Sequence, residues 1–115
     1  MAAGYYDVVI EQGATFSLSL TYKDSTGAAI NLTGFTARSK FKPSFSGTAV
    51  ASLTNVSGIT LGGAAGTIVI VISASDTSAI TAPSSGVYDL EIVSSGGVVT
   101  RLLEGKYTVT PEVTT

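Results

Sequence analysis

Hydrophobic and polar residues alternate along much of this chain, with the period of two that puts successive side chains on opposite faces of a β-strand. Between residues 14 and 22 every second residue is apolar: Phe16, Leu18, Leu20 and Tyr22. A second alternating segment covers Phe35–Phe41. Each predicts a half-buried strand, and Pro43 predicts the end of the second because proline cannot donate a hydrogen bond to the sheet.

The same criteria predict further strands, some more strongly than others. The apolar run at residues 5–11 predicts an N-terminal strand, and Thr48–Leu53 and Gly58–Leu61 predict weaker ones. Thr67–Ile72 is the most β-branched stretch, which predicts a central strand covered on both faces or one pressed against a partner. Gly-rich stretches between these runs predict reversals of the chain, for example at Gly62–Gly66.

One short segment has a helical signature instead. Ser73 is a good N-cap, and Asp76 follows three residues later, near the favourable end of the helix dipole. Pro83 lies soon after, and proline is not tolerated inside a helix. We therefore expect at most one short helical turn, near residues 74–80.

The closing part of the chain, Gly86–Val113, predicts a β-hairpin. Two β-rich runs flank Ser94–Gly97, and Pro111 stops the second run. Gly105 interrupts that run, and an isolated glycine in a strand pattern predicts a β-bulge.

These elements predict an all-β fold. Seven to eight short strands, with turns about every 8–12 residues, are typical of an antiparallel sandwich or a small barrel. The 115 residues fit a single domain, 1–115, because a second core would have too little surface to bury. With no cysteine, stability must come from packing.

Charge is scarce, and its distribution excludes some partners. Only 12% of residues are charged and the net charge is −2, so we expect neighbouring subunits to cover much of the surface and expect no nucleic-acid binding. The tightest basic cluster, Arg38, Lys40 and Lys42, has a period of two. We interpret it as a solvated strand face rather than a polyanion site.

The first ten residues lack the basic start and long apolar core of a signal peptide, and no apolar run approaches the roughly 18 residues of a membrane span. We expect a soluble chain made in the host cytoplasm, with no membrane partner.

The composition also argues against catalysis. Without histidine or cysteine the chain lacks the commonest general base, the thiol nucleophile and the usual transition-metal ligands. Asp89 and Glu91 share a strand face, with Arg101 as their expected cross-strand mate, and a solvent-facing ion pair is favoured over an acid–base pair. We expect no enzyme activity and no small-molecule substrate.

No cofactor is expected either. Gly62–Gly66 lacks the lysine and the following helix of a phosphate-binding loop, so we interpret it as a turn. Asp24 and its loop offer one carboxylate where calcium sites gather several, so a calcium ion there is the less favoured interpretation.

Aromatic residues outside the alternating strands are candidates for partner contact, because aromatics are enriched at interfaces. Tyr5 and Tyr6 are adjacent, so in a strand they would face opposite sides and one would point outward. Phe45 lies in an expected loop, and the tail with Pro111 and Val113 is too short to fold alone. We expect these five residues at a partner interface.

Three segments in order, Ile10–Phe16, Asp24–Arg38 and Gly86–Ile92 continued by Leu103–Gly105, resemble tailed-bacteriophage structural proteins. The pattern is similar to the immunoglobulin-like domain that begins baseplate upper proteins and fibre-anchoring proteins. The resemblance implies an antiparallel immunoglobulin-like β-sandwich that is a virion building block without an active site.

From this resemblance we expect a structural component of the virion, in the tail, baseplate, fibre-attachment or neck region. Its partners would be other virion proteins in a symmetric assembly of many copies. Since those baseplate proteins continue into a coiled coil or receptor-binding module and this chain stops at Thr115, a capsid cement or decoration protein is an alternative. A carbohydrate- or host-surface-binding module is an alternative from another class, although the chain has no tryptophan.

Overall fold

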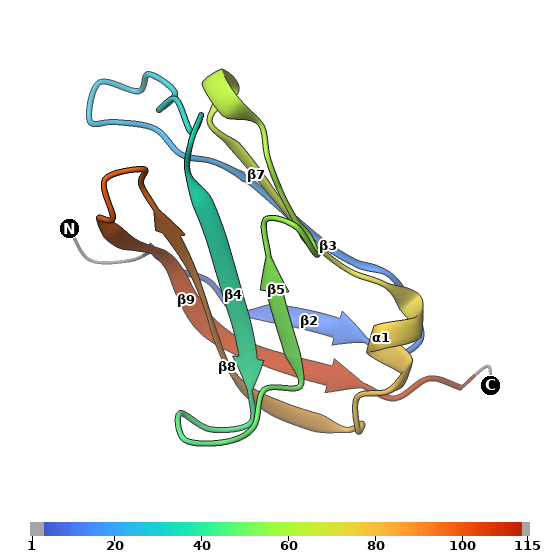
Figure 1. The fold of residues 1–115 in the computed structure, drawn as a ribbon. Helices are drawn as coiled ribbons and strands as arrows, with labels where there is room; N and C mark the ends of the chain where they lie inside the picture. The colour runs from blue at the N-terminus through green and yellow to red at the C-terminus, as the bar shows by residue number, and fades with distance from the viewer. Residues whose placement is uncertain (1–3, 114–115) are drawn as a thin grey trace.

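Two β-sheets pack face to face in the computed structural model, which describes residues 4–113 (Figure 1). In the large sheet the strand order is β1-β9-β8-β4-β5, and β2 also pairs with β9. Its strands are β1 (Gly4–Tyr5), β2 (Val8–Glu11), β4 (Thr36–Lys42), β5 (Ala51–Thr54), β8 (Ser84–Val93) and β9 (Val99–Thr110). The small sheet contains β3 (Phe16–Thr21), β7 (Thr67–Ile72) and β6 (Ile59–Leu61), in that order. The expected β-sandwich of short strands is confirmed.

Strand direction departs from the expected all-antiparallel arrangement at the N-terminus. β1 and β2 both pair with β9 in parallel, whereas the other strand pairs are antiparallel. The chain runs along the edge of the large sheet beside β9 and then crosses to the small sheet at β3 (Figure 1). Periodicity within one segment carries no information about the direction of its neighbour, so the pattern could not predict this pairing.

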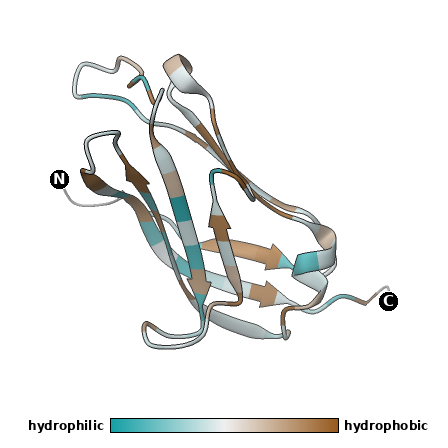
Figure 2. Cartoon of the chain, viewed as in Figure 1, coloured by the Kyte–Doolittle hydropathy of each residue, from teal (hydrophilic) through white to brown (hydrophobic). Residues whose placement is uncertain are grey.

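The inward faces of the two sheets form one apolar core. Phe41 is fully buried and stacks on Tyr88 with ring centroids 5.0 Å apart, while Phe16 and Tyr107 meet it edge-on at 6.1 and 5.6 Å. Figure 2 shows β4 in alternating shades, whereas β2 is hydrophobic along most of its length. The alternation in the sequence is therefore the alternation between core and outer surface.

β7 is the central strand of the small sheet, as expected, but the chain covers only one of its faces. Ile68, Ile70 and Ile72 are buried, whereas Val69 is partly exposed and Val71 is 38% exposed. The expectation that this chain covers both faces is wrong, because only one sheet packs against it. The alternative, an outer face pressed against a partner, stays a prediction.

The expected helical turn is α1 (Ala74–Ser78). The Ser73 hydroxyl oxygen accepts a hydrogen bond from the Asp76 backbone N–H at 3.1 Å, as the capping pattern predicted. Thr77 is buried, and its hydroxyl donates to the Ala14 carbonyl at 2.8 Å, which ties the helix to the β2–β3 connection. A second short helical segment, the 3₁₀ turn η1 (Gly63–Ala65), lies within the predicted reversal, so the limit of one helical turn is wrong.

The β8–β9 hairpin is confirmed, but its bulge lies elsewhere than expected. Leu90 pairs with Leu103 and Glu91 pairs with Arg101, so Leu102 is the extra residue. Gly105 instead lies where a Cβ atom would overlap the Tyr6 carbonyl oxygen, to which the Tyr88 hydroxyl donates a hydrogen bond. This glycine allows the N-terminal segment to approach β9 closely.

Among residues 4–113, no helix has the length and the apolar character required to cross a membrane.

Candidate functional site

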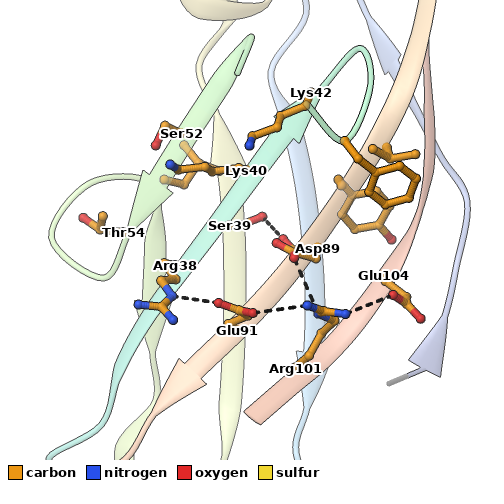
Figure 3. Close-up of a pocket in the computed structure, with 14 residues that line it drawn as sticks. Arg38, Ser39, Lys40, Lys42, Ser52, Thr54, Asp89, Glu91, Arg101 and Glu104 are labelled. Carbon is orange, nitrogen blue, oxygen red and sulfur yellow. Dashed lines mark hydrogen bonds and ion pairs between the residues drawn. The ribbon is translucent and has the colours of Figure 1, made fainter. Parts of the chain in front are cut away.

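A hollow of about 550 Å³ lies on the outer face of the large sheet, across β5, β4, β8 and β9 (Figure 3). Charged side chains from three strands line it, Phe45 contributes from the β4–β5 loop, and two hydroxyl side chains come from β5. The charged residues and the two hydroxyl residues of β5 are Arg38, Lys40, Lys42, Ser52, Thr54, Asp89, Glu91, Arg101 and Glu104.

These charged side chains lie on the outer face of the sheet because alternate residues of the strands point into the core. On β4 the inward residues Ala37, Ser39 and Phe41 are buried, so the intervening basic residues face the hollow. The expectation that Arg38, Lys40 and Lys42 share one face is confirmed. The strand register sets Arg38 opposite Glu91 and Lys40 opposite Asp89.

An ion-pair network joins three strands across this face (Figure 3). Arg38 Nε lies 2.8 Å from Glu91 Oε1, and Arg101 lies 3.6 Å from Asp89, 3.7 Å from Glu91 and 3.7 Å from Glu104. The expected pairing of Arg101 with Asp89 and Glu91 is confirmed. Since both arginine side chains are about half exposed, each pair contributes at most about 1 kcal/mol.

The bulge at Leu102 allows Glu104 to join this network. In an unbroken strand residues three apart face opposite sides of the sheet. The extra residue returns Glu104 to the same face as Arg101. The bulge therefore gathers three carboxylates around one guanidinium group.

One carboxylate at the hollow has a raised pKa, and the charges of the lining residues do not cancel. Burial, followed by the nearby Glu91 carboxylate, raises the pKa of Asp89, and the Arg101 charge only partly opposes this. The hollow is lined by four basic and three acidic residues, a net charge of 4 − 3 = +1 on a chain whose net charge is −2. No grouping of three metal-binding side chains occurs in residues 4–113.

A second cleft, of about 450 Å³, runs between the two sheets at β2 and β3. Tyr6, Val9, Phe16 and Leu18 are among its lining residues. β3 is an edge strand of the small sheet and β2 lies at the edge of the large sheet, so the cleft separates two sheet edges. Asp7 and Glu11 are its charged lining residues, compared with seven charged residues at the hollow.

The five predicted interface residues are all exposed, but they do not form one surface. Tyr5 and Tyr6 were expected to face opposite sides, with one of them outward; both are exposed, by 63% and 54%, because β1 ends at Tyr5. Phe45, 87% exposed, lines the hollow, and Tyr6 lines the second cleft. Pro111 and Val113 are exposed beyond β9 and line neither depression. Their contact with a partner stays a prediction.

The sequence did not identify the hollow as a site. It indicated the shared faces of the charged residues, but nothing in the weak β5 pattern indicated that Ser52 and Thr54 would border them. Asp24, the weighed calcium ligand, is engaged by its own turn: it accepts hydrogen bonds from Thr26 and Ala28, which lower its pKa.

Comparison with known proteins identifies the fold and no family. No protein-family model matches this chain, and no curated protein matches it in sequence. Among solved structures 210 chains are similar. One comes from work on parallel homodimers of the extracellular domains of the voltage-gated sodium channel β4 subunit and their role in cell–cell adhesion. It is 15% identical, with a TM-score of 0.52 over 98% of this chain and 97% of that chain. The fold of this chain is thus an immunoglobulin-like β-sandwich.

Proposed function

We propose that this chain is a structural component of a tailed-bacteriophage virion and that it acts through protein–protein contacts rather than catalysis. It belongs to the tail, baseplate, fibre-attachment or neck region, where its partners are other virion proteins. It is made in the host cytoplasm and incorporated into the particle.

The observation that carries this proposal is where the phage-like segments lie in the fold. Ile10–Phe16 includes the passage from β2 to β3, Asp24–Arg38 leads into β4, and Gly86–Ile92 with Leu103–Gly105 lies in the β8–β9 hairpin. These segments form much of the framework of an immunoglobulin-like sandwich, the fold that the resemblance implies. A resemblance spread over the framework supports a domain of that type better than one confined to a single turn.

The exposed side chains of residues 4–113 are better suited to protein–protein contact than to catalysis. The carboxylates at the hollow are held by Arg38 and Arg101, so they are poorly placed to act as general bases. Exposed apolar groups at Tyr5, Tyr6 and Phe45 instead offer contact area. The sodium channel β4 domain, which shares the fold, forms parallel homodimers, and we include several copies of this chain in the proposed assembly.

The proposal can be tested on phage particles produced by the organism that encodes this gene. Mass spectrometry of purified particles is expected to find the chain in several copies per particle. Its absence from every particle fraction, with the protein expressed in the same cells, would exclude the proposed function. Gold-labelled antibody on intact particles then separates the tail and neck from the capsid-decoration alternative.

A carbohydrate- or host-surface-binding module is the second candidate, favoured by the exposed Phe45 beside polar groups of the hollow. A glycan array with the purified chain distinguishes the two. Binding that depends on one sugar type, and that a Phe45→Ala substitution abolishes, would favour this candidate over assembly.

A further inference from the structure

Two lysines in the hollow have a charge that no carboxylate of residues 4–113 balances. Lys40 and Lys42 both line it, and no carboxylate in residues 4–113 lies within 4.0 Å of either ammonium group. Lys40 faces Asp89 in the strand register, yet the Asp89 carboxylate is paired with Arg101 at 3.6 Å. The positive charge at β4 is therefore available to a partner.

The acidic side chains of the hollow are already engaged. Glu91 lies between two guanidinium groups, at 2.8 Å from Arg38 and 3.7 Å from Arg101, and Glu104 lies 3.7 Å from Arg101. Sugar hydroxyls would have to displace these arginines to reach the carboxylates. The hollow is thus better suited to a ligand that brings negative charge than to a neutral glycan.

Geometry favours an extended ligand. Lys40 and Lys42 are alternate residues of β4, so their Cα atoms are about 6.6 Å apart. Carboxylates at alternate positions of an extended segment have the same repeat. Phe45 and Val87 line the same hollow and offer apolar contact to the segment's other side chains.

We propose that the hollow is the docking site for an extended acidic segment of a neighbouring virion protein. The proposal rests on the assembly role above and adds the chemistry of the partner. Two carboxylates of the segment pair with Lys40 and Lys42, and an apolar side chain between or beside them packs on Phe45.

The test uses the ¹⁵N-labelled chain and a synthetic seven-residue peptide that alternates glutamate with threonine and valine. Amide resonances of Lys40, Lys42 and Ser52 are expected to shift on titration, with a dissociation constant that rises with salt. The double variant K40E/K42E is expected to weaken binding at least tenfold. The matched control is K23E/K106E, which changes the net charge equally at lysines outside the hollow.

Three results would overturn the docking site. They are equal loss in both double variants, resonance shifts that map away from the hollow, and equal binding of a peptide with glutamine in place of glutamate. Tighter binding of a heparin hexasaccharide at the same residues would replace the protein partner with an anionic glycan. If K40E/K42E does not fold by circular dichroism, K40Q/K42Q provides the same comparison with a smaller expected loss.

Particle incorporation distinguishes this proposal from the function on which it rests. If K40E/K42E enters particles as efficiently as the unmodified chain, the docking site is wrong and the assembly role stands. If the unmodified chain enters no particle, the assembly role is wrong whatever the peptide does.

Discussion

The two sheets share a core but differ in their outer faces. The large sheet carries nine of the chain's fourteen charged residues on its outer face: Glu11, Arg38, Lys40, Lys42, Asp89, Glu91, Arg101, Glu104 and Lys106. The small sheet carries none on its outer face, which consists of Ser17, Ser19, Thr21, Thr60, Thr67, Val69 and Val71. Since both inner faces are apolar, the difference is not required by the fold. We therefore predict that the two outer faces make different contacts.

The largest expected effect on stability comes from substitutions in the core. They test whether the two sheets differ only in their outer faces. Phe41→Ala in the large sheet and Ile70→Ala in the small sheet should each destabilise the protein by about 3–4 kcal/mol, because both leave a cavity in a fully buried site. Urea unfolding measures the loss. A loss at one site three or more times that at the other would mean that the sheets also differ inside.

The next effect concerns ionisable groups in the core, which only the large sheet contributes. Burial raises the pKa of Tyr88 to about 12 from 10.0, and burial also raises the pKa of Tyr107. Between pH 10 and 12 the unfolded chain releases these protons before the folded chain does, so the free energy of unfolding falls as pH rises. We expect a loss of about 2 kcal/mol by pH 12.

Tyr88→Phe is the control for this alkaline loss. It removes the hydrogen bond to the Tyr6 carbonyl and should lower the free energy of unfolding at pH 7 by about 1–2 kcal/mol. Its further loss between pH 10 and 12 should then be smaller than that of the unmodified chain. An equal alkaline loss would assign the effect to other groups.

A smaller effect on stability is expected from the ion-pair network on the outer face of the large sheet. Arg101→Gln leaves three carboxylates without their shared guanidinium group and should destabilise the protein by up to about 1 kcal/mol at low salt. The loss should shrink in 0.5 M salt, since the groups are partly exposed. Lys106→Gln, on the same strand but outside the network, should change little, and equal losses at both positions would contradict the network's role.

The smallest effect tests the small sheet's outer face. Ser19→Lys and, on the other face, Lys40→Ser should each change the free energy of unfolding by less than about 0.5 kcal/mol, because both side chains are exposed. A destabilisation above 1 kcal/mol by Ser19→Lys in dilute solution would show that the uncharged face matters to the fold itself.

Much of the local structure could be predicted from the amino-acid sequence. Ala37, Ser39 and Phe41 turned inward as their alternation indicated, and Ser73 caps the helical turn. The site was only partly predictable. Arg101 was expected opposite Asp89 and Glu91, but the bulge was assigned to Gly105, and Glu104 joins Arg101 only because the extra residue is Leu102. A glycine marks either a bulge or a close backbone approach, and one sequence does not distinguish them.

For the alternating strands β3 and β4, the sequence by itself determined which side chains face the core and which face out, because successive side chains of a strand point to opposite sides. It also determined that the commonest acid–base and thiol chemistry is absent, since the chain has no histidine or cysteine. Only the tertiary structure decided which strands are neighbours: that β2 lies parallel to β9, that β4, β8 and β9 bring their charges to one hollow, and that the small sheet's outer face has none. Strand pairing joins segments that are far apart in the chain. No local pattern shows which of these segments will lie side by side.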